Sequence, residues 1–234
     1  MNTSPLVTRG YLTISGSDAR NFLQNLITND IDQLQSRPYL HASLLTPQGK
    51  FLHDFYITTI EDGFCLNCEP ASRADDLFKR LTLYKLRANI QIEKQDDKNS
   101  YLTSYGYSFD DLKSSLSVEE WELNRFKRAR ADGSRDADIG ISTLDELNLT
   151  DTVSFDKGCY LGQELTARMH HRGLGKKHLY AIESDHPLPP KDTELPNKVG
   201  IMRSSHGRYG LALIKDDMAQ TLPKSSLGFL RLSC

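Results

Sequence analysis

One cysteine of this chain lies in a segment whose residue types fit chemistry at a thiol. Cys159 is part of FDKGCYLGQELTARMHHRG, residues 155–173, and Lys157 precedes it by two positions. The residues from Gly162 onward have the pattern of a helix, so Cys159 is expected just ahead of a helix N-terminus. The positive end of a helix and a nearby ammonium group both favour the thiolate, which is the nucleophilic form of cysteine. The segment therefore indicates a reactive thiol.

The same segment also has a structural interpretation. A cysteine is small enough to fill the gap where a strand meets a helix, and Glu164 and Arg168 have the spacing of a surface ion pair worth about 0.2 to 0.5 kcal/mol. His170 and His171 are adjacent and cannot share one helix face, so spacing does not support a metal site that includes Cys159. The two histidines form either a surface cluster or anion contacts for a charged ligand tail. The residues alone leave both interpretations of the segment open.

A second group of candidates surrounds the single tryptophan, Trp121. A lone tryptophan usually lies in a core, but one beside a basic run can stack on a planar ligand ring. The run RFKRAR, residues 125–130, is the most basic stretch of the chain. Such a run is usually a solvated face, and the alternative is that it contacts the phosphates of an RNA partner.

Two further cysteines, Cys65 and Cys68, form a C-x-x-C pair inside a predicted strand. Strand residues three apart point to opposite faces, so the two sulfur atoms are expected to diverge. No second C-x-x-C is present to complete a zinc site, and no metal is expected. Because the chain lacks a secretion signal pattern, all four cysteines, which include Cys159 and Cys234, are expected to be reduced thiols.

The composition is that of a soluble globular protein. Among 234 residues, 38% are hydrophobic and 26% are charged, and 29 basic against 31 acidic side chains give a net charge of -2. This balance provides no overall field toward nucleic acid or an anionic membrane. The sequence has neither a signal-peptide pattern nor an apolar stretch of about 18 residues. We therefore expect a cytoplasmic protein without membrane contact, and the lack of an unassigned apolar stripe predicts a monomer.

The elements that must position these residues follow from the hydrophobic pattern. Residues 10–15 predict a strand, and the residues after it predict a helix capped by Ser17 or Asp18. The apolar face of this helix consists of Phe22, Leu23, Leu26 and Ile27. Residues 71–87 predict a second helix with the apolar residues Leu77, Phe78, Leu81 and Tyr84.

Between these two helices, residues 41–45 and 51–60 predict a hairpin around the turn formed by residues 46–49. Successive residues of a strand point to opposite faces. Asp54 therefore shares a face with Leu52 and Tyr56, and it is expected to sit among apolar neighbours.

The chain divides into three predicted portions. Residues 1–95 predict an N-terminal α+β domain in which helices pack on an antiparallel sheet. Residues 96–177 predict a short central α+β portion. Residues 178–234 contain short strands divided by turns with Pro and Gly, and this pattern predicts a small C-terminal β-barrel.

A resemblance to a known family rests on the Cys159 segment and on the N-terminal portion. VSFDKGCYLGQELTAR resembles the K-G-C-Y-x-G-Q-E signature of the YgfZ-type folate-binding proteins, which are relatives of the glycine-cleavage aminomethyltransferase, or T-protein. ISGSDARNFLQNLITNDI, LLTPQGKFLHDF and DGFCLNCEP resemble successive segments of the family's first half. The resemblance covers residues 9–95 and 147–180 well and the C-terminal portion loosely. It implies an aminomethyltransferase-like fold of the α+β class, with three small domains around a central hole that accepts tetrahydrofolate.

The resemblance also implies roles for individual residues. Cys159 matches the functional cysteine of the signature, with Lys157 beside it. The implied contacts to tetrahydrofolate, or to a one-carbon derivative of it, are Asp54, Trp121, Tyr160, Gln163, Glu164 and Arg168.

The chain departs from the family pattern at several places. The portion between residues 96 and 146 is short. GKFLHDF stands where the aminomethyltransferases have a pattern resembling GGxxDD, so that His53 replaces one acid and Asp54 matches the other. Arg9 occupies a place where some YgfZ-type proteins carry a tryptophan.

The function that the resemblance implies is a folate-dependent accessory role in the synthesis or repair of iron-sulfur clusters. Its partners would be iron-sulfur enzymes or assembly factors, including one that methylthiolates tRNA, which gives an indirect link to tRNA. The sequence leaves open whether a one-carbon transfer is catalysed. One alternative is an aminomethyltransferase of the glycine-cleavage type, with Asp54 as its acid, and the K-G-C-Y signature argues against it. The other alternative is a non-catalytic scaffold in which Cys159 holds a cluster or a partner's thiol.

Overall fold

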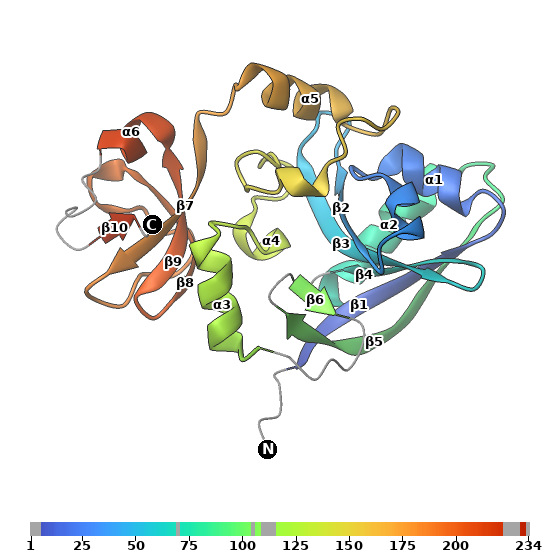
Figure 1. Ribbon diagram of the computed structural model, residues 1–234, viewed down its shortest axis with the longest axis horizontal. Helices are drawn as coiled ribbons and strands as arrows, with labels where there is room; N and C mark the ends of the chain where they lie inside the picture. The colour runs from blue at the N-terminus through green and yellow to red at the C-terminus, as the bar shows by residue number, and fades with distance from the viewer. Residues whose placement is uncertain (1–5, 69–70, 104–105, 109–115, 222–229, 233–234) are drawn as a thin grey trace.

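The N-terminal part of the molecule is a six-stranded antiparallel sheet (Figure 1). The computed structural model describes residues 6–68, 71–103, 106–108, 116–221 and 230–232. The strands are β1 (Leu6–Ser15), β2 (Leu40–Leu45), β3 (Phe51–Ile60), β4 (Gly63–Cys68), β5 (Gln91–Thr103) and β6 (Gly106–Ser108). Their order in the sheet is β2-β3-β4-β1-β5-β6, so the first strand of the chain lies in the interior of the sheet.

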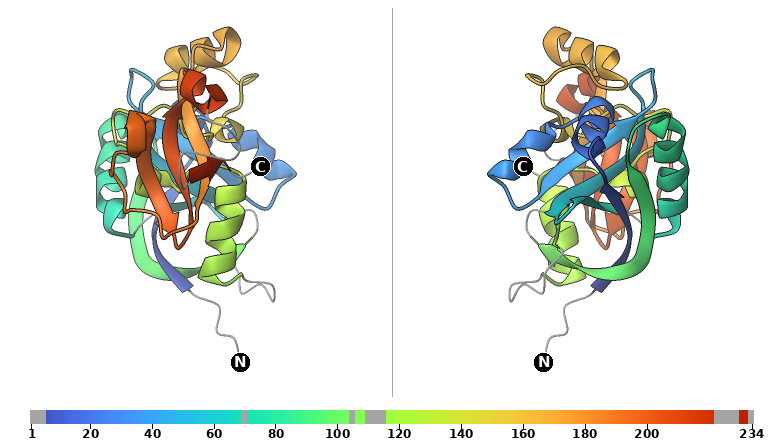
Figure 2. Two further views of the ribbon diagram at one scale, coloured as in Figure 1. Left: turned by 90° about the vertical axis from the view of Figure 1, so that its left-hand side faces the viewer. Right: turned by 90° about the vertical axis from the view of Figure 1, so that its right-hand side faces the viewer.

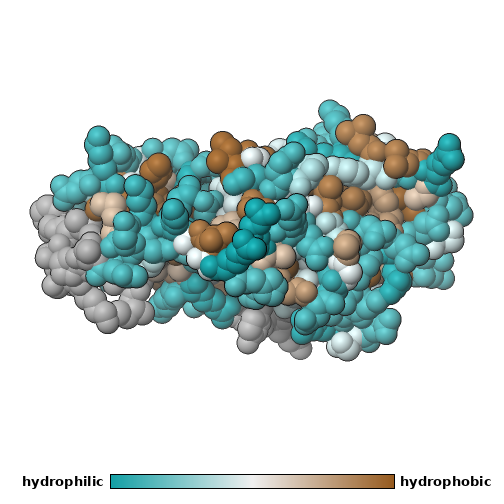
Figure 3. Space-filling view, turned by 90° about the horizontal axis from the view of Figure 1, so that it is seen from above, coloured by the Kyte–Doolittle hydropathy of each residue, from teal (hydrophilic) through white to brown (hydrophobic). Residues whose placement is uncertain are grey.

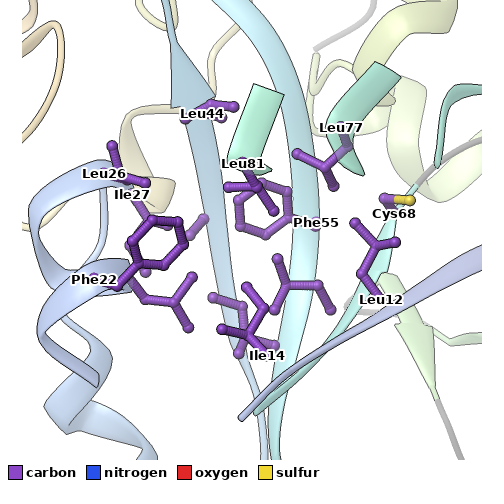
Figure 4. Close-up of a cluster of buried hydrophobic side chains, with 14 of the residues drawn as sticks. Leu12, Ile14, Phe22, Leu26, Ile27, Leu44, Phe55, Cys68, Leu77 and Leu81 are labelled. Carbon is purple, nitrogen blue, oxygen red and sulfur yellow. The ribbon is translucent and has the colours of Figure 1, made fainter. Parts of the chain in front are cut away.

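Two helices, α1 (Ala19–Leu26) and α2 (Ala74–Lys85), cover one face of this sheet (Figures 1 and 4). Alternate strand residues supply the apolar surface beneath them, among them Leu12, Phe55 and Leu66, each fully buried. The four apolar residues predicted for the first helix are all buried in this core, which confirms that prediction. Two short 3-10 helices, η1 (Ile31–Gln35) and η2 (Ala71–Arg73), adjoin the helices.

The β2–β3 hairpin is confirmed, and its turn packs against a later helix. Gly49 N donates to Thr46 O at 2.8 Å, and Gly49 has a φ of 76°. A Cβ on Gly49 would lie 2.7 Å from Leu165 Cβ, and one on Gly162 would lie 2.5 Å from Thr46 O. Gly162, where the sequence predicted the helix to begin, is the N-cap of α5 (Gln163–Arg172) and has a φ of 81°. The two glycines therefore allow the hairpin turn and the start of α5 to approach closely.

The central segment lies between two sheets (Figure 1) and contains α3 (Val118–Lys127), α4 (Gly133–Asp136) and the 3-10 helix η3 (Thr150–Thr152). A capping box between Ser117 and Glu120 starts α3. A second apolar core includes Phe51 of β3, Phe126 of α3 and Leu211 of the C-terminal sheet. This shared core joins the N-terminal sheet, the central segment and the C-terminal part into one packed body.

The C-terminal part is an antiparallel sheet with the order β10-β7-β9-β8 (Figure 2). Its strands are β7 (Lys177–Ser184), β8 (Gly200–His206), β9 (Tyr209–Lys215) and β10 (Leu230–Leu232), accompanied by η4 (Pro196–Lys198) and α6 (Asp216–Thr221). The predicted strands are present, but the order within the described residues is open at both ends. Closure into the predicted barrel is therefore not confirmed.

The predicted division of the chain meets the observed elements at two points. β5 runs without interruption across the boundary predicted between residues 95 and 96. β7 begins at Lys177, next to the predicted start of the C-terminal portion. Within the described ranges, no helix is long and apolar enough to cross a membrane.

The C-x-x-C pair lies in β4, as predicted, and its two residues differ in environment. Cys68 belongs to the apolar core, and its Sγ donates to Gly10 O at 3.4 Å, whereas Cys65 is half-buried. In the part of the chain that the structure describes, no group of three or more His, Cys, Asp or Glu residues is arranged to hold a metal ion. Cys234 lies outside the described residues.

Candidate functional site

A cavity of about 450 Å³ lies between the second face of the N-terminal sheet and the central segment. We call it the central cavity. The sheet contributes His41, Asp54 and Tyr56 to its lining. The other residues that line it include Asn29, Arg37, Trp121, Arg125, Arg128, Arg130, Asp132 and Asp151.

The sheet wall of the cavity is polar because strand register aligns polar residues on one face. His41 of β2 pairs with Tyr56 of β3, Tyr56 pairs with Asn67 of β4, and Asn67 pairs with Tyr11 of β1. These four residues form a row across four strands, and Asp54 is two residues from Tyr56 on the same face. Asn67 Nδ2 donates to the Tyr11 hydroxyl at 2.9 Å.

Asp54 lies at this wall with only 4% of its surface exposed. Its Oδ2 is 2.8 Å from His41 Nε2. The His41 ring stacks on the Tyr56 ring, with centroids 4.2 Å apart and planes 6° from parallel. The sequence predicted apolar neighbours for Asp54. Tyr56 shares its face as expected, but the surroundings are not apolar because β2 places His41 beside the carboxyl group.

Tyr56 and Arg9 are both buried at this polar face. Burial raises the pKa of Tyr56 well above its ordinary value, so its hydroxyl stays protonated at neutral pH. Arg9 is fully buried, and its Nη2 donates to Asn67 O at 3.2 Å. Its guanidinium carbon lies 5.9 Å from the centre of the Tyr56 ring, within the range of a cation–π contact.

The opposite wall is built by α3 and the residues after it. Trp121 is 7% exposed and lines the cavity. Arg125 lies over its ring at 5.5 Å and forms ion pairs with Glu122 at 2.6 Å and Asp136 at 2.5 Å. The basic run at residues 125–130 is only partly the solvated face that its composition predicted, because Lys127 and Arg128 are exposed whereas Arg125 and Phe126 are buried.

Besides Arg125, three arginine side chains from two segments reach the cavity. Arg37 and Arg128 line it, and Arg130 extends from the segment after α3 to the sheet wall. Arg130 Nη2 is 2.8 Å from His41 Nδ1, and its Nη1 donates to Asp151. The cavity thus combines a buried carboxylate, aromatic side chains on two walls and several guanidinium groups.

Cys159 is exposed on the loop that leads into α5 and is not among the residues that line the cavity. α5 lies on the face of the molecule shown in Figure 3, which is mostly hydrophilic with scattered hydrophobic residues. Only Thr166 of this helix is buried. The thiol is therefore open to solvent and to a partner molecule.

The ammonium group of Lys157 donates to backbone oxygens and not to the thiol of Cys159. Its Nζ donates to the carbonyl oxygens of Gln24 at 2.7 Å, Ile27 at 2.9 Å and Asn29 at 2.9 Å. Three acceptors account for all three protons of an ammonium group. Burial lowers the pKa of Lys157 to about 8. The sequence expectation that Lys157 supports a thiolate at Cys159 is replaced by a structural role, in which Lys157 fastens the Cys159 loop to the end of α1.

The remaining residues of the signature segment lie away from the central cavity. Tyr160 is buried, which raises its pKa to about 12, and Lys157 Nζ is 5.2 Å from its ring centre. Gln163 Oε1 accepts from Tyr160 N at 3.4 Å. Glu164 and Arg168 form the exposed i,i+4 pair that the structural interpretation predicted, at 2.5 Å.

The two histidines of α5 have unequal surroundings. His170 stacks on Phe155, with ring centroids 3.7 Å apart and planes 14° from parallel. His171 meets the Phe155 ring edge-on at 6.2 Å. Neither lines the central cavity, so the predicted anion contacts of this cluster are separate from it.

The structure therefore brings Asp54 and Trp121 together at one cavity and places the Cys159 segment elsewhere on the surface. Sequence reasoning missed His41, Arg37 and Arg130 as cavity residues. The predicted hairpin contained a signal for His41, because the register of β2 against β3 aligns it with the face of Asp54. The signal for Arg130 was its place in the basic run, but the direction in which the Arg130 side chain points depends on packing.

No family model matches this sequence. The architecture is that of the aminomethyltransferase T fold, because the glycine cleavage system aminomethyltransferase T from Bartonella henselae superposes with a TM-score of 0.76. That match covers 98% of this chain and 84% of that protein at 13% sequence identity.

Among curated proteins the chain is similar to mitochondrial proteins named iron-sulfur cluster assembly factor IBA57. The human protein is 28% identical over 270 residues, which cover 88% of this chain and 75% of the human one. The mouse protein is 24% identical, with 89% and 76% covered. A homologue from Coccidioides immitis is 26% identical, and the match covers 79% of this chain and 58% of that protein. The chain thus has the fold of an aminomethyltransferase and is similar over most of its length to iron-sulfur cluster assembly factors.

Proposed function

We propose that this protein is a folate-dependent accessory protein for the synthesis or repair of iron-sulfur clusters in specific enzymes. The observation that carries the proposal is the buried carboxylate of Asp54 in a cavity with aromatic side chains on two walls, within an aminomethyltransferase T fold. The similarity to assembly factors supports the iron-sulfur part. Partners would be iron-sulfur enzymes, including tRNA-modifying ones, or other assembly factors.

The residues of the central cavity fit tetrahydrofolate. A reduced pterin offers N–H donors and a ring with flat faces, and the glutamate tail is anionic. Asp54 is an acceptor for such donors, Trp121 and the stacked His41 and Tyr56 offer ring surfaces, and Arg37 and Arg128 offer cations. The cavity volume of about 450 Å³ falls in the usual range for small-molecule sites. When bound, a reduced folate would supply or accept a one-carbon unit.

Cys159 and the cavity would have separate tasks. Asp54 and Trp121 would hold and orient the folate, whereas the exposed thiol of Cys159 would meet a partner, a one-carbon unit or a cluster intermediate. A thiol on an exposed loop is accessible to a macromolecule, and a reactive cysteine needs such access.

Isothermal titration with tetrahydrofolate under anaerobic conditions tests the folate site. We expect the wild-type protein to bind and both Asp54→Ala and Trp121→Ala to bind about tenfold or more weakly. Glu61→Gln, in the turn between β3 and β4, is a matched control outside the cavity and should bind normally. A wild-type protein that does not bind tetrahydrofolate would contradict the proposal.

The role of Cys159 is tested by the activity of iron-sulfur enzymes in cells that lack the wild-type protein. Cys159→Ala should fail to restore activity and should unfold at the wild-type temperature, because the side chain is exposed. Cys65→Ala, the half-buried cysteine of β4, is the matched control. Full activity of Cys159→Ala would remove the thiol from the proposed function.

A second candidate function is aminomethyl transfer, which the fold and the position of Asp54 favour. Such a reaction needs an acid that assists proton movement at the folate amine, and Asp54 lies in the cavity where that amine would bind. Formation of methylene-tetrahydrofolate from an aminomethylated carrier protein would establish this activity. If the protein does not form methylene-tetrahydrofolate but restores the activity of iron-sulfur enzymes, the result would favour the first proposal.

A further inference from the structure

Three side chains from distant parts of the sequence form a hydrogen-bonded chain at the central cavity. Arg130, after α3, reaches His41 of β2 with 2.8 Å between Nη2 and Nδ1. His41 in turn reaches Asp54 of β3 with 2.8 Å between Nε2 and Oδ2. The side chains of His41 and Asp54 are 12% and 5% exposed, so both hydrogen bonds are largely shielded from water.

The chemistry of these groups fixes the direction of both hydrogen bonds. A guanidinium group has donors and no acceptor, so His41 Nδ1 must accept from Arg130. The ring proton of a neutral imidazole then lies on Nε2, which donates to Asp54. Stacking on Tyr56 sets the plane of the ring along this direction. The chain therefore delivers an N–H donor to the carboxyl group of Asp54.

From this arrangement we infer that His41 and Arg130 are positioning residues, which hold Asp54 as an oriented carboxylate for N–H groups of the ligand in the central cavity. The inference rests on the proposed function, because it assigns how the folate site is kept ready. It also adds a requirement that does not follow from the fold alone. His41 must be a neutral histidine with its proton on Nε2, so that it serves as a hydrogen-bond donor in the cavity.

The hydrogen-bonded chain depends on which nitrogen of His41 carries the ring proton. A proton on Nδ1 would place an N–H group against the Arg130 donor, so the contact with Arg130 would be lost. The positioning of Asp54 therefore requires the tautomer of His41 with its proton on Nε2.

Two substitutions at the same position test the role of the imidazole. His41→Phe keeps a ring on Tyr56 and removes both nitrogen atoms. His41→Gln has an amide that does not titrate. This amide can donate to Asp54 and accept from Arg130. We expect His41→Phe to weaken tetrahydrofolate binding about tenfold and His41→Gln to stay within about threefold of wild type at pH 7.

Rescue by the amide separates positioning from a structural role. Glutamine can restore both hydrogen bonds without the ring, so His41→Gln should bind tetrahydrofolate about threefold or more tightly than His41→Phe. A residue that only supported the fold would lower the unfolding temperature of both variants without producing this order of affinities. Equal affinity of wild type and His41→Phe, or equal affinity of the two variants, would overturn the inference.

Nitrogen-15 NMR of labelled histidine reads the tautomer without any ligand. The wild-type protein at pH 7.5 should show His41 with its proton on Nε2, and Arg130→Met should lose this preference because the fixed donor is gone. A proton on Nδ1 in the wild type would overturn the inference. If His41 has the expected tautomer but the protein does not bind tetrahydrofolate, the result would instead contradict the proposed function and the assignment of the ligand.

Discussion

The two faces of the N-terminal sheet have opposite characters, although they share the same strands. One face is apolar and lies under α1 and α2, with Leu12, Ile14 and Phe55 fully buried (Figure 4). The other face has Asp54 and Tyr56 at the central cavity. Alternation along β3 thus assigns covalent neighbours to different tasks. The comparison indicates that packing under the helices stabilises this sheet, whereas the polar face carries the proposed binding site.

The largest expected effect comes from opening a hole in the apolar face. Phe55→Ala removes a fully buried ring and should lower the free energy of unfolding by about 3 to 5 kcal/mol, measured by urea denaturation. Tyr56→Phe, its neighbour on the polar face, keeps the ring and should cost only about 1 kcal/mol. A larger loss in Tyr56→Phe than in Phe55→Ala would break the comparison.

A pH effect of similar size should come from His53, which lies on β3 beside α2. Burial and the nearby Arg73 lower the pKa of His53 to about 4, whereas an unfolded chain has a histidine pKa of about 6.5. The unfolded state therefore binds more protons between these values, and stability falls as the pH drops from 6.5 to 4, by up to about 3 kcal/mol. Urea denaturation at several pH values should show a shallower fall in His53→Gln. The same slope in both proteins would remove His53 as the cause.

The polar face should show a binding effect with little loss of stability. Asp54→Asn keeps the shape of the side chain and removes its charge, so tetrahydrofolate affinity should fall about tenfold, or about 1.4 kcal/mol. The free energy of unfolding should change by about 1 kcal/mol, because the amide can still accept from His41. Titration calorimetry and urea denaturation of the same sample measure both quantities. A variant that unfolds far more easily but binds normally would reverse the assignment of the two faces.

The smallest effect is expected outside this sheet, at His178 of β7, and it has the opposite sign. Burial acts to lower the pKa of His178, but hydrogen bonds to Asp216 and Asp145 outweigh it and raise the pKa. The stabilisation that protonated His178 contributes is present below pH 6.5 and is lost as the pH rises through the pKa of His178 in the folded state. Because the ring is partly exposed, the loss should stay below about 1 kcal/mol. Comparing His178→Gln with wild type at pH 6 and pH 8.5 measures it, and an equal change in both proteins would count against it.

The sequence predicted the local elements well because their causes are local. The hairpin follows from the turn at residues 46–49, and the apolar face of α1 follows from the spacing of Phe22, Leu23, Leu26 and Ile27. The start of α5 at Gly162 was also predicted. Each of these depends on residues within one or two turns of one another.

The surroundings of the site residues were harder to predict because they depend on distant segments. Alternation showed that Asp54 and Tyr56 share a face, but β2 supplies His41 and a segment 76 residues after Asp54 supplies Arg130. Lys157 looked like a partner for Cys159 because it is close in sequence. Its actual acceptors are backbone carbonyl oxygens 128 to 133 residues away, and main-chain oxygens leave no trace in side-chain types.

The anchoring of Lys157 has a consequence for how variants of this protein should be interpreted. One of its three acceptors is the carbonyl oxygen of Asn29, and Asn29 also lines the central cavity. The Cys159 loop and the central cavity therefore share one stretch of backbone. A substitution that displaces this backbone would disturb both proposed sites at once, so the loss of both proposed activities in one variant is no evidence of global unfolding.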